Sequence, residues 1–320
     1  MSRVLVTGAG GFVGGHLCRR LAAAGLSIRA AARRSLPYAI PGDRFQQCLI
    51  PGVGPTTDWT MAVEGVDSVV HLAARAHVLE ARGERHLEAF REVNVEGSRS
   101  LAQASIRAGV RRLVMLSSIK AMGEETVVGQ CYAEDSPCRP SDPYGISKRE
   151  AEQALWETAA GSNMEVVIVR APLVYGPRVG ANFLRLLRAV DRGTPLPLGS
   201  VKNRRSLCYV ENLTSAIMSC LDHPAAGGQV FLVADEQAPS TRELVCRLGE
   251  LLGRSPRLLP IPILLLRIAG RISGKSDEIR RLTGSLLLST AKIRQRLDWR
   301  PPFTLDDGLR TTVAWYRSLE

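Results

Sequence analysis

Residues 3–17 read RVLVTGAGGFVGGHL, an apolar run that passes through closely spaced glycines into a helical pattern. A GxxGxxG spacing between a strand and an amphipathic helix permits a tight turn and a close approach of the backbone to a pyrophosphate. The N-terminus of the helix then favours the negative charge of the phosphates. The pattern therefore predicts a dinucleotide site formed by Gly8, Gly11, Phe12, Val13 and Gly14.

Further short apolar runs alternate with helical patterns along the first half of the chain, and these runs lie at residues 27–32, 68–74, 111–118 and 165–172. This alternation predicts an α/β fold with a Rossmann-like, doubly wound parallel sheet that places ligands beyond the carboxyl ends of its strands. From Pro172 the pattern becomes less regular. We therefore expect residues 1–171 to form the dinucleotide-binding domain. Residues 172–320 should form mainly a smaller substrate-binding lobe, with some segments returning to the first domain.

Composition limits the partners of the chain. The 320 residues carry a formal net charge of +11, which favours an anionic ligand. No basic arm or recognition-helix pattern accompanies the spread arginines, so we expect no nucleic-acid partner. The seven cysteines include no CxxC pair and no neighbouring histidine cluster. We therefore expect reduced thiols in a cytoplasmic protein, without a metal site.

Two features bear on membranes. The N-terminal residues enter a strand pattern at once, so we expect no signal peptide. The apolar stretch at residues 258–272 is too short to span a bilayer and contains two prolines and Arg267. It predicts a helix packed on the protein, with interfacial membrane contact as the less favoured alternative and no integral membrane segment.

The end of the second strand bears on the choice of cofactor. A carboxylate there would accept hydrogen bonds from the adenosine ribose and favour NAD(H), but residues 30–35 read AAARRS. Guanidinium groups are better suited to a 2′-phosphate. Arg33 and Arg34 therefore favour NADP(H), with NAD(H) as the alternative.

Tyr144 and Lys148, in DPYGISKREAE, lie one helical turn apart and thus on the same helix face. A neighbouring ammonium and a positive nicotinamide favour the phenolate, which would bring the pKa of the tyrosine toward neutrality. The apolar run at residues 113–116 ends in two serines, and a hydroxyl at Ser118 would bond the same substrate oxygen as Tyr144. These three side chains predict a proton-transfer site.

The chain resembles the extended short-chain dehydrogenase/reductase family of nucleotide-sugar epimerases, dehydratases and reductases. The resemblance covers essentially the whole chain, through TGAGGFVG, HLAA, VNVEGS, LSS, PYGISK and RAPLVYGP. It implies that Ser118, Tyr144 and Lys148 are the catalytic triad, and that Tyr144 and Lys148 also contact the cofactor. It further implies that Asn94 supports the site and that the cofactor is lined by Leu72, Ala73, Ala74 and Pro172. The stretch CLIPGVGP lacks the acid that often meets the adenine in this family.

The resemblance also implies a UDP-sugar substrate. Asn182 and Arg205 occupy positions where relatives contact the diphosphate, and bidentate arginine–phosphate bonding supplies a physical reason for the second. Arg281 is a weaker candidate for the same role. Lys120, two residues after Ser118, either contacts the sugar or faces solvent.

The residues after Ser118 bear on the reaction. Sugar 4,6-dehydratases have an Asp-Glu pair there, but this chain has Ile119 and Lys120, which disfavours dehydration. The phrases LSSIKAMGE and RLTGSLLLST look most like the 4-ketoreductases that make UDP-N-acetylquinovosamine in surface-polysaccharide synthesis. We therefore expect reduction of a UDP-linked 6-deoxy-4-hexulose, with 4-epimerisation as the alternative. A non-catalytic dinucleotide sensor is a remote third possibility, because such a protein would lack part of the triad.

Relatives of this family pair across a two-fold axis. The matching helices lie at residues 86–108 and 144–160, so we expect a homodimer.

Overall fold

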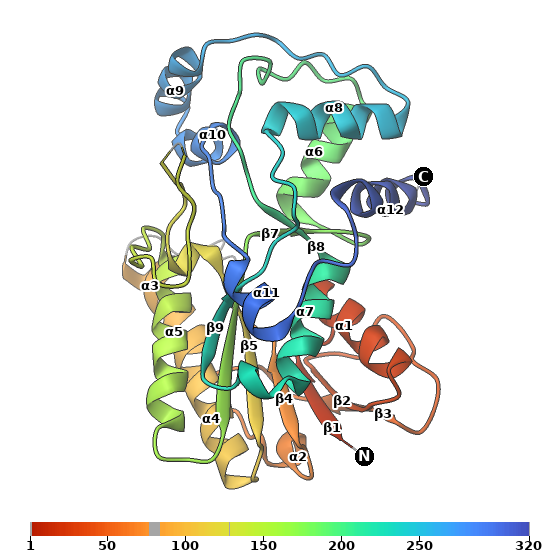
Figure 1. Ribbon diagram of the computed structural model, residues 1–320, viewed down its shortest axis with the longest axis vertical. Helices are drawn as coiled ribbons and strands as arrows, with labels where there is room; N and C mark the ends of the chain where they lie inside the picture. Colours follow the sequence, from red (N-terminus) through yellow and green to blue (C-terminus); the bar gives the residue numbers. More distant parts are fainter. Residues whose placement is uncertain (1, 77–83, 128, 320) are drawn as a thin grey trace.

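The computed structural model describes residues 2–76, 84–127 and 129–319. Its centre is a seven-stranded parallel sheet in the order β3-β2-β1-β4-β5-β6-β9 (Figure 1). The strand order reverses between β1 and β4, and a crevice for ligands forms at such a switch point. The expected Rossmann-like fold is therefore confirmed. The strands are β1 (Arg3–Thr7), β2 (Ser27–Ala32), β3 (Phe45–Leu49), β4 (Ser68–His71), β5 (Arg112–Ser118), β6 (Glu165–Ala171) and β9 (Gln229–Leu232).

Helices cover both faces of the sheet because its strands carry apolar side chains on both sides. One core joins the sheet to α1 (Phe12–Ala23), α7 (Val210–Asp222) and α11 (Ala291–Leu297). A second core joins the opposite face to α2 (Thr60–Val63), α4 (Gly97–Arg107) and α5 (Pro143–Ala159). Helix α3 (Glu84–Arg91) packs beside α5.

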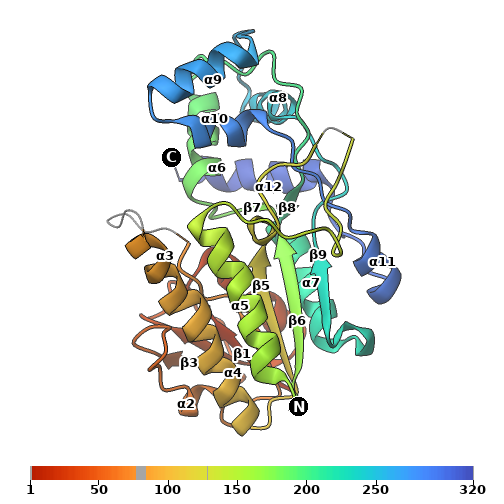
Figure 2. The same cartoon turned by 90° about the vertical axis from the view of Figure 1, so that its left-hand side faces the viewer.

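The second lobe has its own core. A two-stranded parallel sheet of β7 (Leu173–Tyr175) and β8 (Leu207–Tyr209) packs with α6 (Ala181–Asp191), α8 (Thr241–Leu252) and α12 (Leu305–Arg317). Helix α9 (Ile263–Ile272) lies at the end of this lobe farthest from the sheet, and α10 (Ser276–Thr283) packs beneath it (Figures 1 and 2).

Several segments after residue 172 lie with the first lobe. β9 pairs with β6, α7 packs against the central sheet, and α11 contacts the short helix η3 (Pro224–Ala226). The chain thus crosses between the lobes more than once, and this places segments from both halves of the sequence at the carboxyl ends of the strands.

The helix expected at residues 86–108 is not one continuous α-helix. Between α3 and α4 the backbone forms a π-helix, η1 (Glu92–Glu96), and Asn94 lies at its centre. Such single-turn bulges are rare and recur at functional sites.

Candidate active site

The glycine-rich turn is shaped by backbone contacts that leave no room for side chains. Gly8 has φ +70°, and a Cβ there would lie 2.8 Å from the backbone nitrogen of Ala73. A Cβ on Gly14 would lie 2.3 Å from the carbonyl oxygen of Gly8. The N–H of Gly11 donates to that same carbonyl at 2.9 Å. The turn therefore forms the tight cradle at the start of α1 that a dinucleotide pyrophosphate requires.

The other side chains expected around the cradle are placed on both sides of it. Phe12 and Val13 are half-buried and pack against the core of the second lobe. Pro172 is buried at the β6–β7 junction. Leu72 and Ala73 are half-buried after β4, and Ala74 is exposed.

At the end of β2, Arg33 and Arg34 are both exposed. A second pair of side chains, Arg19 and Tyr38, was not predicted from the sequence. The guanidinium of Arg19 lies 5.0 Å from the Tyr38 ring centroid, and the Tyr38 hydroxyl donates to the carbonyl of Ala9 at 2.9 Å. The adenosine side of the cradle thus carries arginines from both α1 and the β2 end.

A buried chain of hydrogen bonds connects the cradle to α4. The Thr7 hydroxyl accepts from the N–H of Ala73 at 3.3 Å and lies 2.7 Å from Nδ1 of His71. Nε2 of His71 lies 3.0 Å from Oγ of Ser98, and that hydroxyl donates to the carbonyl of Asn94 at 2.6 Å. Since the Ser98 proton is already used, Nε2 carries the histidine proton and Nδ1 accepts from Thr7. Burial, reinforced by the charge of Lys148, lowers the pKa of His71 to about 3, so this ring is neutral.

Asn94 ties the loop after β4 to the helix of the predicted triad. Its Oδ1 accepts from the N–H of Arg75 at 2.8 Å, and its Nδ2 donates to the Arg75 carbonyl at 3.0 Å and to Oγ of Ser147 at 2.9 Å. The Ser147 hydroxyl in turn donates to the carbonyl of Tyr144 at 2.8 Å. The position of Tyr144 is therefore coupled to the π-helix.

The start of α5 is fixed by its cap. Asp142 is the N-cap residue, and its Oδ1 accepts from the N–H of Gly145 at 2.7 Å. Pro143 follows at the first helical position, where its missing N–H costs nothing. A Cβ on Gly145 would lie 2.4 Å from the carbonyl oxygen of Lys120, so only glycine lets the helix start against the end of β5.

Ser118 and Tyr144 meet at this point. A hydrogen bond from Ser118 lowers the pKa of the phenol, but burial and the charge of Asp142 outweigh it and raise that pKa to about 12. The sequence-based expectation of a lowered pKa includes the charge of a bound nicotinamide, and it stays a prediction. In the protein alone, Nζ of Lys148 donates to the carbonyl of Leu116 at 2.8 Å.

Lys148 is buried, with 2% of its surface exposed. Burial lowers the pKa of its amine to about 8, against the opposing charge of Glu152. Glu152 lies one turn further along α5, accepts from Ser117 at 2.5 Å and pairs with the buried guanidinium of Arg170 at 2.6 Å. Sequence reasoning missed this carboxylate, although its spacing of four residues from Lys148 was a usable signal.

Lys120 forms ion pairs. Its Nζ binds the Asp142 carboxylate and lies 2.9 Å from Oε1 of Glu124. Glu124 also binds the guanidinium of Arg280 on α10. Burial alone would raise the pKa of the Glu124 carboxyl, but these cations hold it below its ordinary value. Lys120 thus connects the start of α5, through Asp142, to α10 of the second lobe, through Glu124.

The two arginines expected at the diphosphate lie near each other. Burial lowers the pKa of Arg205, and the charge of Arg281 adds a smaller lowering against the carboxylates of Glu125 and Glu124. Nη1 of Arg205 donates to the carbonyl of Gly284 at 2.9 Å. Asn182 is exposed at the start of α6, and its Oδ1 accepts from Arg185 at 2.5 Å. Arg185 in turn lies 3.7 Å from the carboxylate of Glu278 on α10.

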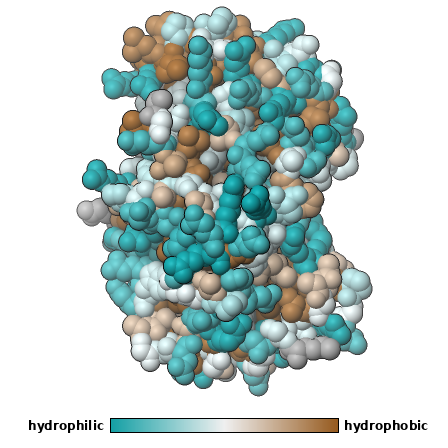
Figure 3. All heavy atoms as spheres, viewed as in Figure 1, coloured by the Kyte–Doolittle hydropathy of each residue, from teal (hydrophilic) through white to brown (hydrophobic). Residues whose placement is uncertain are grey.

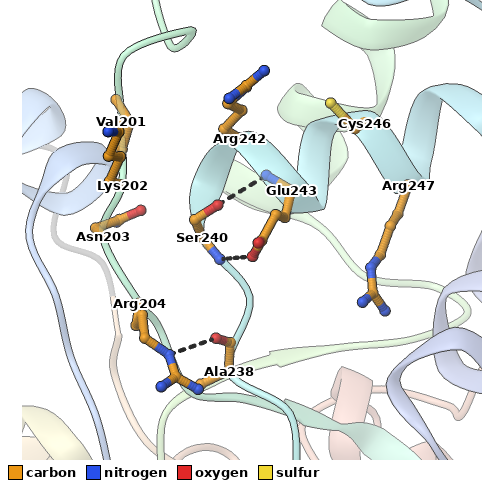
Figure 4. A pocket seen from close by; sticks show the side chains of 10 residues that line it. All are labelled: Val201, Lys202, Asn203, Arg204, Ala238, Ser240, Arg242, Glu243, Cys246 and Arg247. Carbon is orange, nitrogen blue, oxygen red and sulfur yellow. Dashed lines mark hydrogen bonds between the residues drawn. The ribbon is translucent and has the colours of Figure 1, made fainter.

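A separate pocket of about 660 Å³ lies between the segment before β8 and the start of α8 (Figure 4). Its lining includes four basic side chains, those of Lys202, Arg204, Arg242 and Arg247. No residue of the triad or of the glycine-rich turn lines it. The pocket therefore belongs to the second lobe alone.

Within the described part of the chain, no helix has both the length and the hydropathy needed to cross a bilayer.

Comparison with known proteins agrees with this geometry. The model of the NAD dependent epimerase/dehydratase family matches residues 4–234. A protein of Vibrio cholerae described as UDP-glucose 4-epimerase is 41% identical over 311 residues, which are 97% of this chain and 94% of the relative. A protein of Escherichia coli O157:H7 is 27% identical over 98% of this chain and 94% of the relative's length. It is described as N-acetyl-alpha-D-glucosaminyl-diphospho-ditrans,octacis-undecaprenol 4-epimerase.

Solved structures add the fold of the complete chain. The structure of MoeE5 in complex with UDP-glucuronic acid and NAD superposes with a TM-score of 0.79 at 26% identity and covers 100% of both chains. The family match spans more than half of the sequence, and the Vibrio relative spans nearly all of it. The chain therefore belongs to the NAD dependent epimerase/dehydratase family.

Proposed function

We propose that the protein interconverts the C4 epimers of a UDP-hexose or UDP-N-acetylhexosamine with NAD as its cofactor. The meeting of Ser118 and Tyr144 at the end of β5, with Lys148 one turn away, is the observation that carries this proposal. The description of the Vibrio relative favours the epimerase over the 4-ketoreductase that the sequence phrases favoured. NAD bound beside UDP-glucuronic acid in MoeE5 supports the same pair of ligands.

The roles of the three side chains follow from their protonation. Bound NAD would supply a hydride acceptor and donor for carbon 4. Tyr144 takes the proton of the 4-hydroxyl during oxidation and returns it during reduction, while Ser118 holds the same oxygen. With a pKa of about 12 in the protein alone, Tyr144 stands ready as the proton donor. During oxidation Tyr144 must instead be the phenolate that accepts the proton, and the charge of Lys148 would favour that form.

Dehydration is not supported by the residues beside Ser118. Ile119 is buried and has no ionisable group that could transfer a proton. The ammonium of Lys120 is paired with the carboxylates of Asp142 and Glu124. Elimination of water needs a further acid and base on the sugar, which these side chains do not supply.

On the diphosphate, we propose contacts from Asn182, Arg205 and Arg281.

Reduction of a UDP-linked 6-deoxy-4-hexulose is the second candidate. The exposed Arg33 and Arg34 favour a cofactor with a 2′-phosphate, and a reductase consumes NADPH whereas an epimerase regenerates its NAD. This arrangement at the β2 end is the specific observation in favour of the reductase.

One experiment separates the two reactions. Purified protein is incubated with UDP-glucose or UDP-N-acetylglucosamine without a reduced cofactor, and separately with UDP-4-keto-6-deoxy-N-acetylglucosamine plus NADPH or NADH. Formation of the C4 epimer without net cofactor consumption supports the epimerase. Loss of reduced-cofactor absorbance with the keto sugar, without epimer formation in the first incubation, supports the reductase. No reaction in either incubation contradicts both proposed reactions.

Cofactor choice has its own test. If Arg33 and Arg34 bind a 2′-phosphate, R33A/R34A weakens NADPH binding by about tenfold or more and leaves NADH binding nearly unchanged. R296A/R300A, which removes two exposed arginines on and after α11, is the matched control. Equal NADPH affinity in all three proteins rules out the phosphate role.

We further propose a cytoplasmic homodimer that acts in surface-polysaccharide synthesis. The helices at residues 86–108 and 144–160 would pair across the two-fold axis. Sedimentation velocity at micromolar concentration tests the dimer, and a monomer there contradicts it.

A further inference from the structure

Helix α9 and its flanks hold an unusual share of the exposed apolar surface. Of the twelve large apolar side chains that are exposed in the described part of the chain, six lie between residues 259 and 282. Figure 3 shows apolar residues gathered at the upper left of the molecule, where Figure 1 places α9. The six are Leu259 (44%), Leu264 (70%), Leu265 (54%), Ile268 (47%), Ile272 (84%) and Leu282 (38%). Contiguous patches of this kind mark interaction surfaces.

These side chains form a stripe that points away from the protein. Leu264, Ile268 and Ile272 follow one another at intervals of four residues and so share one helix face, which Leu265 broadens. The opposite side of α9 is the packed one. Leu266 is buried there, and a Cβ on Gly270 would lie 2.6 Å from the Ile279 side chain of α10. α9 is thus attached through a narrow side while its broader apolar face remains open.

Positive charge flanks α9, and the nearest exposed acidic side chains along the chain are Asp277 and Glu278 on α10. Residues 254–275 contain five basic side chains and no acidic one. Arg267 and Arg271 are exposed and precede Ile268 and Ile272 by one position each, so they line one edge of the stripe. Lys275 is exposed just beyond the end of the helix. An arginine at the edge of an apolar stripe can lay its stem along apolar surface and keep its charge in a polar layer.

We infer that α9 is a membrane-contact helix that docks the protein on a bilayer surface containing anionic lipids. The ten residues of α9 lie in the interface plane, with the stripe of Leu264, Ile268 and Ile272 among the upper acyl chains and Arg267 and Arg271 at the lipid phosphates. This inference does not depend on the proposed reaction.

The charge pattern favours a lipid surface over a second copy of the chain. In an antiparallel two-fold contact between two α9 stripes, the arginines at the edges of both copies would come together in a partly desolvated interface. Like charges in such a place repel, whereas an anionic bilayer supplies the complementary charge along the whole helix.

Vesicle flotation of the full chain tests the inference. The parent protein is mixed with vesicles of equal parts phosphatidylcholine and phosphatidylglycerol, and separately with pure phosphatidylcholine vesicles, at low and at physiological salt. We expect flotation with the anionic vesicles that weakens as salt rises. Failure to float with anionic vesicles at low salt overturns the inference.

Two variants identify the surface. L264Q/I268Q/I272Q lowers the partition coefficient by roughly a hundredfold, because it removes the apolar contact. R267Q/R271Q lowers it by about tenfold and removes most of the salt dependence. The matched controls are L49Q/M61Q, which alters exposed apolar side chains of the first lobe, and R296Q/R300Q, which removes the same charge elsewhere. Both controls float like the parent.

NADH binding and thermal unfolding of every variant show that the fold is kept. Equal flotation of the triple variant and the parent overturns the inference. A second pair of results also overturns it: the parent is a dimer that does not float, and the triple variant sediments as a monomer. In that case α9 is an interface between copies of the chain.

Discussion

At the scale of single residues, the site is organised by groups whose protonation is fixed by burial. Tyr144 holds its proton, His71 is neutral, and Lys148 is a buried amine with a pKa of about 8. Each of these states follows from the cost of placing a charge where water is excluded. Their consequences are separately measurable.

Replacing the Tyr144 hydroxyl removes the proposed proton carrier. We expect Y144F to lower kcat by about a hundredfold to ten-thousandfold, while NADH binding stays nearly unchanged. Steady-state kinetics and cofactor titration measure the two effects. Y132F, which removes a phenol that donates to the carbonyl of Glu125, keeps the parent rate as the control. Undiminished turnover of Y144F would refute the assignment.

His71 makes the protein sensitive to acid. Its folded pKa of about 3 lies below the ordinary value of 6.5, so as pH falls the unfolded chain takes up this proton first and stability is lost. The loss from this one group is about 3 kcal/mol between pH 7 and pH 4. Urea unfolding at both pH values measures it in the parent and in H71Q.

H71Q keeps a side chain that can both donate and accept but cannot take up the proton. Its stability at pH 7 falls, yet its loss between pH 7 and pH 4 is smaller than that of the parent. The same loss in both proteins would mean that the imidazole is not the group responsible.

At the scale of elements, the start of α5 combines a structural and an electrostatic function in Asp142. The carboxylate caps the helix, binds Lys120 and raises the pKa of Tyr144. D142N keeps the capping ability and removes the charge, whereas D142A removes both.

We therefore expect D142A to cost about 1 kcal/mol more stability than D142N, because it lacks the cap. Both variants lower the pKa of Tyr144, so the limb of the pH–rate profile that reports this group moves to lower pH. Urea unfolding and pH–rate profiles measure the two effects. An unmoved limb in D142N would show that the charge of Asp142 does not reach the phenol.

The elements also show what the sequence could and could not supply. The glycine spacing and the strand pattern predicted the parallel sheet and the cradle, since both depend on local geometry. The π-helix at Asn94 was not predictable from periodicity, because its contacts include a bond to Ser147 on another helix. β9 also escaped prediction, since its four residues pair with β6 only after a long excursion through the second lobe.

For the site, motif positions brought Ser118 and Tyr144 together correctly. Lys120 had no predictable partner, because Asp142 is distant in sequence and Glu124 lies in an irregular segment. The spacing of Glu152 from Lys148 was a local signal, but its pairing with Arg170 on β6 was not, since that arginine is distant in sequence. Long-range ion pairs of this kind leave no local pattern.

At the scale of the whole molecule, Glu124 links the lobes. Its carboxylate is 8% exposed and binds Lys120 at the end of β5 and Arg280 on α10. α10 also carries Arg281, the proposed diphosphate ligand. The bridge therefore ties α10 of the second lobe to the segment after β5.

We expect E124Q to raise KM for the UDP-sugar several-fold, with a smaller effect on kcat, because α10 loses its attachment. D277N is the matched control, because it removes the other carboxylate that pairs with Arg280. The Asp277 side chain is 70% exposed, so this ion pair contributes little to stability. Steady-state kinetics of both variants decide the matter. Equal KM values in E124Q and the parent would show that the bridge does not position the lobe.

The π-helix η1 also constrains how this chain tolerates changes in length. It takes up one residue more than an α-helical turn, so that Asn94 faces the β4 loop while Leu101 and Ala102 still face the sheet. Deleting any one residue of the turn would restore a regular helix and rotate one end against the other by about 100°. Either the amide or the apolar face would then point the wrong way. A scan of single-residue deletions should therefore find residues 92–96 far less tolerant than the exposed turn at residues 160–163.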